Sequence, residues 1–141
     1  MDNRKFAYSW IGYIAVSSPV AVIWHLVLFK PLYDELGVYT RKEPIIALGV
    51  FSMIVQGAVL AYLYPIFYKH RGGSPAQEGL LYGVLMGAFM WSVAVIAEGA
   101  KHQVSSLSTW LVLESIYYLI QFFLVGLAIG LIHGRGDSPR G

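Results

Sequence analysis

The sequence predicts an all-α integral membrane protein, an antiparallel bundle of four transmembrane helices that forms a single domain over residues 1–141. Of the residues, 57% are hydrophobic and 13% are charged, about half the charge content of a typical soluble domain. At a rise of about 1.5 Å per residue, a run of about 20 apolar residues crosses the hydrocarbon core of a bilayer. Four runs of about this length or more lie at about 6–29, 44–68, 79–97 and 109–132.

The first apolar run, residues 6–29, follows Arg4 and Lys5 and therefore has a basic start like that of a signal peptide. The apolar core of a signal peptide usually has about 7–15 residues, and this run is much longer. We therefore expect it to be retained as the first membrane-spanning helix. Pro19 lies inside the run and is expected to kink it.

The remaining elements are separated by polar segments of different lengths. The longest, 30–43, contains leucines and tyrosines that favour a short helix on the membrane surface. The second run begins at Pro44, a residue suited to the first turn of a helix. A polar turn at 69–78 leads to the third run, which ends at Glu98, and a short loop leads to the fourth. The tail, 134–141, is expected to be disordered.

Basic residues predict how the helices are oriented, because loops rich in Lys and Arg stay in the cytoplasm. Six of them fall on the side of the two termini and four on the other side. We therefore expect both termini in the cytoplasm and the lipid bilayer as the main partner. The net charge of +2 does not indicate nucleic-acid binding, and the absence of cysteine excludes disulfides and thiolate metal sites.

Glycines recur every four residues in the last two runs. They lie at Gly79, Gly83 and Gly87 in the third run and at Gly126, Gly130 and Gly134 in the fourth. Helices in lipid associate through close van der Waals contact, which small residues at this spacing allow. Because a short loop joins the two runs, we expect these glycines to meet within one chain. The alternative is that one glycine row faces a second copy of the protein.

Ionisable and polar residues inside the apolar runs form the main candidate site. With both termini on one side, a histidine and two glutamates fall at a similar depth on three different helices, where such residues usually face an interior or a wet cavity. Helical spacing adds a polar row to each helix, so that the four rows can meet. The predicted pocket consists of His25, Gln56, Glu98, Glu114 and Tyr118.

Several interpretations of these residues are open. Glu98 can simply lie at the membrane surface beside Lys101, and His25 can be an ordinary hydrogen-bonded contact between helices. Glu114 lies deeper and indicates a buried interaction. Together, His25, Glu98 and Glu114 also offer a nitrogen and oxygen ligand set for a metal, or a pocket for a small ligand, a proton or an ion.

Enzyme and cofactor chemistry receives little support from the sequence. Haem could be held by His25 with His102 or by His70 with His133, but most of these histidines lie at or beyond helix ends. A serine hydrolase arrangement with His25 and Glu114 lacks the sharp turn motif around its nucleophile. We therefore favour no cofactor and do not favour an enzyme.

The chain resembles a family of small bacterial four-helix membrane proteins known only as a domain of unknown function. The residues that carry the resemblance are Trp24 before Leu28-Phe29, the segment from Gly79 to Gly87, and the segment from Tyr117 to Gly130. The resemblance implies a location in the bacterial inner membrane. It assigns no catalytic or binding residue.

Two functions follow as expectations from these observations. The first is an accessory or structural subunit of a membrane assembly or homo-oligomer, because the chain has almost no soluble mass, carries no enzyme motif and has glycine rows suited to helix contacts. The second is a small transporter, or a protein that binds a ligand or metal in its intramembrane polar pocket.

Overall fold

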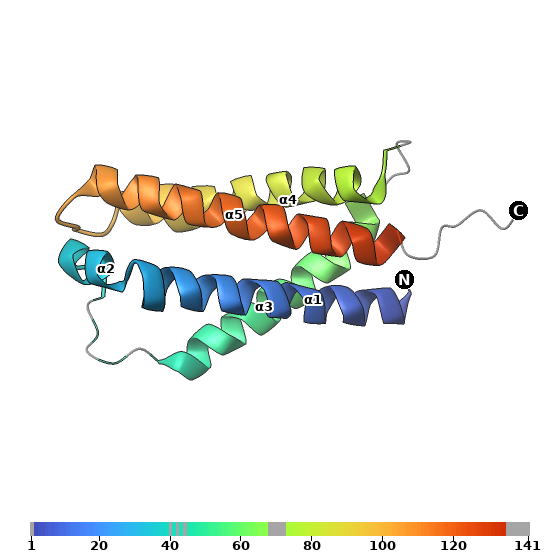
Figure 1. Cartoon of the computed structure of the whole chain (residues 1–141), viewed down its shortest axis with the longest axis horizontal. Helices are drawn as coiled ribbons and strands as arrows, with labels where there is room; N and C mark the ends of the chain where they lie inside the picture. Colours follow the sequence, from blue (N-terminus) through green and yellow to red (C-terminus); the bar gives the residue numbers. More distant parts are fainter. Residues whose placement is uncertain (1, 40, 42, 44, 68–72, 135–141) are drawn as a thin grey trace, which may run out of the picture.

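In the computed structural model, which describes residues 2–39, 41, 43, 45–67 and 73–134, every regular element is a helix (Figure 1). No strand occurs in these ranges, which confirms the predicted all-α class. In chain order the elements are α1 (Asn3–Val22), the π-helix η1 (Ile23–Leu28), α2 (Lys30–Leu36), α3 (Ile46–Phe67), α4 (Pro75–Trp91), the π-helix η2 (Ser92–Ala97) and α5 (Leu107–Gly134). Residues 69–72 of the predicted turn at 69–78, Pro44 at the predicted start of the second run, and residues 135–141 of the predicted tail lie outside those described. Gly134, predicted to begin the tail, is instead the last residue of α5.

Four continuous helical stretches are long and apolar enough to cross a membrane: α1 with η1, α3, α4 with η2, and α5. The third begins about one turn before its predicted start because Ser74 caps it. The Ser74 hydroxyl accepts a hydrogen bond from the backbone N–H of Gln77, whose side chain accepts one from the backbone N–H of Ser74. This reciprocal pair satisfies N–H groups that no earlier helical turn can bond.

The short helix α2 lies in the connection where the sequence predicts a surface helix. It follows η1 directly and ends at Gly37, whose φ of 73° is the left-handed conformation that glycine adopts most easily. Tyr33 and Leu36 are its buried residues. The Ser105 backbone N–H donates to the Leu36 carbonyl at 3.1 Å, which ties the end of α2 to the loop before α5.

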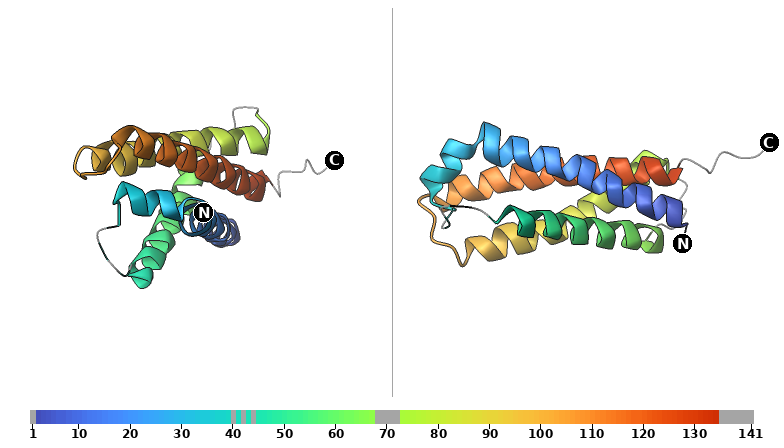
Figure 2. Two further views of the ribbon diagram at one scale, coloured as in Figure 1. Left: turned by 60° about the vertical axis from the view of Figure 1, so that its left-hand side comes forward. Right: turned by 90° about the horizontal axis from the view of Figure 1, so that it is seen from below.

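The long helices pack as α4 on α5, and as α1 on α3 and α5 (Figures 1 and 2). The start of α1 lies beside the end of α5, where the Lys5 ammonium donates to the His133 carbonyl at 2.8 Å. At the opposite end, η1, α2, η2 and the start of α5 come together. The apolar cluster at this end consists of Tyr33, Leu36, Val95, Trp110 and Leu113.

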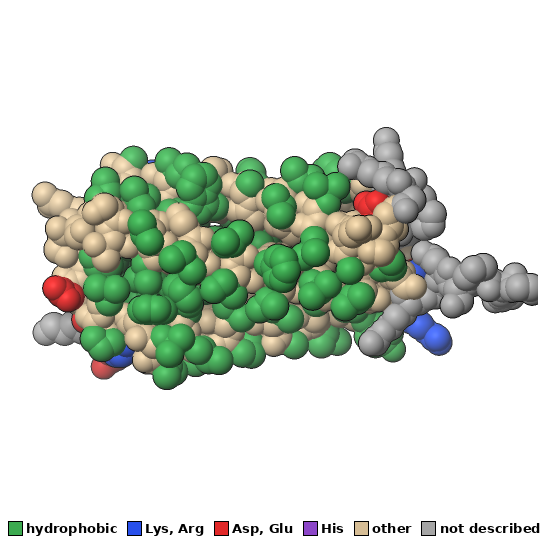
Figure 3. Space-filling view, turned by 45° about the horizontal axis from the view of Figure 1, so that its top comes forward, with side chains coloured by type: hydrophobic (Ala, Val, Ile, Leu, Met, Phe, Trp, Pro, Cys, Tyr) green, Lys and Arg blue, Asp and Glu red, His purple; other side chains and the backbone are tan. Residues whose placement is uncertain are grey.

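The outer surface of the bundle is mostly apolar. Hydrophobic side chains cover most of the face seen in Figure 3. Large apolar residues such as Phe51, Phe89 and Leu119 are more than half exposed, and fewer than half of the residues in each long apolar stretch are buried. Soluble monomers rarely expose apolar patches on this scale, so the surface agrees with a membrane protein.

Candidate functional site

The centre of the candidate site is a contact between His25 and Glu114. His25 comes from η1 and Glu114 from the third turn of α5. Nε2 of His25 lies 3.5 Å from Oε1 of Glu114, and their side chains are 23% and 10% exposed. Two of the residues predicted to form the pocket therefore meet, and the glutamate is almost fully buried.

The orientation of the His25 ring follows from its second contact. Nδ1 lies 3.1 Å from the carbonyl oxygen of Ala21, one turn earlier. Because a carbonyl oxygen only accepts hydrogen bonds, Nδ1 carries a hydrogen and donates it. Nε2 is therefore the ring nitrogen available to Glu114.

Tyr33 from α2 completes the contact with a hydrogen bond. Its hydroxyl donates to Oε1 of Glu114, and the indole N–H of Trp24 donates to the Tyr33 oxygen at 3.2 Å. Burial, and next the hydrogen bond to Glu114, raises the pKa of Tyr33 above its ordinary value. Tyr33 therefore stays a neutral donor at physiological pH.

Aromatic rings surround the imidazole of His25. Its centroid lies 4.5 Å from that of Tyr117, edge to face, and 4.9 Å from that of Tyr33. The Trp24 ring packs on Tyr117 with centroids 6.1 Å apart. The pair is thus a small polar centre inside an aromatic shell, where charge is poorly solvated.

Glu98 has different partners. It accepts hydrogen bonds from the Lys101 ammonium at 2.9 Å and lies 2.7 Å from Nε2 of His102. The Lys101 hydrogen bond, followed by that of His102, lowers the pKa of Glu98 below its ordinary value. No hydrogen bond or ion pair among the described residues joins Glu98 to His25 or Glu114.

The other two residues of the predicted pocket make other contacts, although Tyr118 lies one turn after Glu114 on α5. Gln56 on α3 accepts from the Tyr13 hydroxyl at 2.7 Å and donates to Ser52 at 2.8 Å, so it links α3 to α1. Tyr118 stacks on Phe122, with ring planes inclined by 12°. The structure therefore brings together two of the five predicted residues.

The described residues assemble no metal site. No group of three His, Cys, Asp or Glu side chains within them is placed to hold a metal ion. The haem pairs considered from the sequence are not supported either, since His25 contacts Glu114 whereas His102 contacts Glu98. His70 lies outside the described residues.

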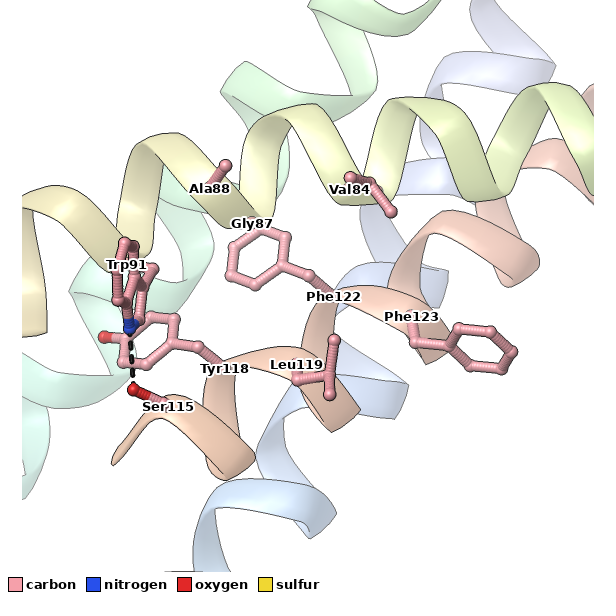
Figure 4. A pocket seen from close by; sticks show the side chains of 10 residues that line it. Val84, Gly87, Ala88, Trp91, Ser115, Tyr118, Leu119, Phe122 and Phe123 are labelled. Atoms are coloured by element: carbon pink, nitrogen blue, oxygen red, sulfur yellow. Dashed lines mark hydrogen bonds between the residues drawn. The ribbon is translucent and has the colours of Figure 1, made fainter. Parts of the chain in front are cut away.

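A groove between α4 and α5 encloses a volume of about 340 Å³ (Figure 4). Its walls are apolar and include Val84, Leu119 and Phe122. At one end, the indole N–H of Trp91 donates to the hydroxyl of Ser115 at 2.9 Å. The groove shares Tyr118 with the predicted pocket, but neither His25 nor Glu114 lines it.

The glycines of α4 and α5 lie at a contact between the two helix backbones. A Cβ atom on Gly79 would lie 2.3 Å from the carbonyl oxygen of Gly126, and one on Gly83 would lie 2.4 Å from that of Phe122. A Cβ on Gly130 would meet the Pro75 carbonyl oxygen at 2.3 Å. At the ends of the two rows, Gly87 adjoins the side chain of Phe122 and Gly134 that of Pro75. Only glycine allows the helices to approach this closely.

Two partners of the pair, Tyr33 and Trp24, are absent from the sequence-based pocket. Tyr33 lies in the connection, where the sequence indicates contact with the membrane surface rather than with a buried carboxylate. One feature of the sequence could have indicated Tyr33. It lies eight residues after His25, just beyond the end of the first apolar run.

Comparisons of the chain with protein-family models, with curated proteins and with solved structures found no match. The family resemblance described above therefore stays a prediction, and the proposals below rest on the residues and their geometry.

Proposed function

We propose that the chain is a bacterial inner-membrane protein whose four long helices cross the bilayer in antiparallel order, with both termini in the cytoplasm. The exposed apolar surface of the long helices supports the insertion. Arg4 and Lys5, in the first turn of α1, support a cytoplasmic N-terminus. Lys69, Arg71 and the arginines of the tail add to this count from positions outside the described residues.

Within the membrane, the protein acts as an accessory or structural subunit of an assembly or homo-oligomer. The observation that carries this proposal is the uncovered first half of α3, in which no residue from 46 to 56 is buried. Gly49 has no neighbour within 4 Å of an added Cβ, and Ser52 on the same face is exposed. A row of small and polar residues on an exposed helix face is suited to close packing against another membrane helix.

The test is the native mass of the full chain in mild detergent. We expect a particle heavier than one protomer, and we expect Gly49→Leu to dissociate it without unfolding the chain. Ala47→Leu is the matched control, because Ala47 is exposed and lies about 160° around the helix from Gly49. A monomeric wild type purified without a partner, or equal masses for the two variants, would contradict the proposal.

A second candidate function is a small transporter or ligand-binding membrane protein. The specific observation in its favour is the buried His25–Glu114 contact, since ionisable groups inside a membrane usually mark an ion, proton or substrate pathway. Glu114→Gln separates the two candidates. An assembly subunit would keep its native mass, whereas a transporter would lose binding or transport with its fold intact.

The same purified sample also tests for cofactors. Metal content and an absorption spectrum would reveal a metal, a haem or a coloured ligand. Retention of such a group in the wild type and its loss in His25→Ala would favour the second candidate.

A further inference from the structure

The contact between His25 and Glu114 is favourable when the two side chains share a proton. Nδ1 of His25 already donates to the Ala21 carbonyl, so Nε2 faces the carboxyl group at 3.5 Å. A bare lone pair on Nε2 and an ionised carboxylate would repel each other. The observed approach is favourable when one proton lies on Nε2 or on the carboxyl group.

The surroundings of Glu114 determine how strongly the charge of the site depends on that proton. The ionisable groups that face it are His25 from η1, Tyr33 from α2, Tyr39 from the following loop, and Tyr117 and Tyr118 of α5 itself. The neighbouring residue of η2 at this end is the apolar Val95. Among the ion pairs of the described residues, the only partner of Glu114 is His25.

The number of protons therefore sets the charge of the buried site. With one proton between them, the two side chains are neutral in total. Without it, the site keeps a single negative charge in apolar surroundings, which is costly. The repulsion between Nε2 and the carboxylate would then separate η1 from α5, while Tyr33 would still donate to Glu114.

We propose that His25 and Glu114 form one proton-binding site, loaded and unloaded through the exposed edge of His25 at the α2 end of the bundle. The His25 side chain is 23% exposed, whereas that of Glu114 is 10% exposed, so the histidine is the more accessible member of the pair. The π-helix that carries His25 supports this role, because such segments are rare and frequently occur at functional sites.

This inference deepens the second candidate function but is tested without it. The chain contains a second His–Glu contact, between His102 and Glu98, which is exposed and shared with Lys101. It serves as an internal control, since both pairs have the same chemistry but only one is buried.

The experiment is a pH titration of the full chain in mild detergent from about pH 4 to about pH 10, which spans the ordinary range of both groups. The ring signals of ¹⁵N-labelled histidine report on His25, and infrared absorption of the carboxyl group reports on Glu114. Glu114→Gln and His25→Gln assign the signals. Glu98→Gln is the control variant.

We expect Glu114→Gln to shift the titration of His25, because the two side chains contact each other at 3.5 Å. His25→Gln should in turn move the carboxyl step of Glu114, because coupling within a pair is reciprocal. Glu98→Gln should leave both steps unchanged and move only that of His102.

Independent titration of the two residues would overturn the proposal. A titration midpoint of His25 that is the same in Glu114→Gln as in the wild type would also overturn it. If Glu114→Gln fails to fold, the carboxyl step in His25→Gln decides the question alone. A coupled titration without any transport would leave this inference standing and remove the transporter function.

Discussion

The two ends of the bundle hold their helices together in different ways. At the end where α1 begins, α4 and α5 meet through glycines, and an added Cβ on Gly79 or Gly126 would fall within 2.5 Å of a backbone oxygen. At the other end, side chains make the contact, with His25 and Tyr33 both reaching Glu114. The first contact has no group that can change its charge, whereas the second depends on protons.

The difference suggests a division of roles between the two ends. A backbone contact of this kind fixes the distance between α4 and α5, because neither helix can move closer and separation loses the close packing. The polar end can rearrange when a proton arrives or leaves, since its helices are joined through exchangeable hydrogens. We therefore expect mutations at the first end to change stability alone, and mutations at the second to change both stability and the response to pH.

The largest effect is expected for Gly126→Val. The added side chain would meet the Gly79 carbonyl oxygen and the Gly83 backbone, neither of which can yield as a flexible side chain would. We expect a loss of about 3 kcal/mol in the free energy of unfolding, at the upper end of overpacking costs. Thermal unfolding in one detergent measures it. Ala47→Val is the control, because Ala47 is exposed on α3 and lies away from the Gly49 face; an equal loss in both would refute the backbone contact.

A smaller effect is expected for Glu114→Ala. It removes the acceptor of the Tyr33 hydroxyl and the partner of His25. Leaving a buried donor unsatisfied costs about 1–3 kcal/mol. The matched substitution Glu98→Ala should change stability by less than about 0.5 kcal/mol, because it removes an exposed pair. Denaturant unfolding of both variants checks the difference, and similar losses would show that burial does not separate the two glutamates.

Tyr33→Phe should have a more local effect. It deletes the hydrogen bond to Glu114 and the one accepted from Trp24 and leaves the ring in place, at a cost of about 1–2 kcal/mol. Hydrogen exchange should then quicken in the backbone amides of α2 and stay unchanged in α4. Tyr39→Phe is the control, since Tyr39 is 44% exposed. Unchanged exchange in α2 would mean that the hydroxyl does not help to hold this helix.

Much of the fold could be predicted from the sequence because it depends on composition and length. Four long apolar runs and a short helix in the connection require only hydrophobicity, helical rise and chain breakers. The glycine rows could also be predicted from the sequence, since a spacing of four residues places them on one face of a helix. These features depend on local patterns, which a single sequence displays directly.

The shared site of three ionisable residues was harder to predict because it relied on helical phase. Glu98 lies on the same helix face as Gly87 only if the helix keeps 3.6 residues per turn from one residue to the other. The π-helix η2 lies between these two residues and has more residues per turn than an α-helix. The rotational position of Glu98 around the helix therefore differs from the one that regular α-helical spacing predicts. Glu98 also follows the end of η2, where Lys101 and His102 are within reach.

The smallest effect is expected at the exposed Glu98, and it sharpens the contrast with the buried Glu114. Lys101 and then His102 lower the pKa of Glu98, so the stabilisation from these contacts is present above the ordinary glutamate range and is lost as pH falls through the lowered value. Solvent and salt screen the contribution. An NMR titration of the Glu98 carboxyl group should therefore show a midpoint below that of a free glutamate, and Lys101→Met should raise it. A midpoint that Lys101→Met leaves unchanged would contradict this account. Added salt should likewise raise the Glu98 midpoint, because counterions reach this exposed pair.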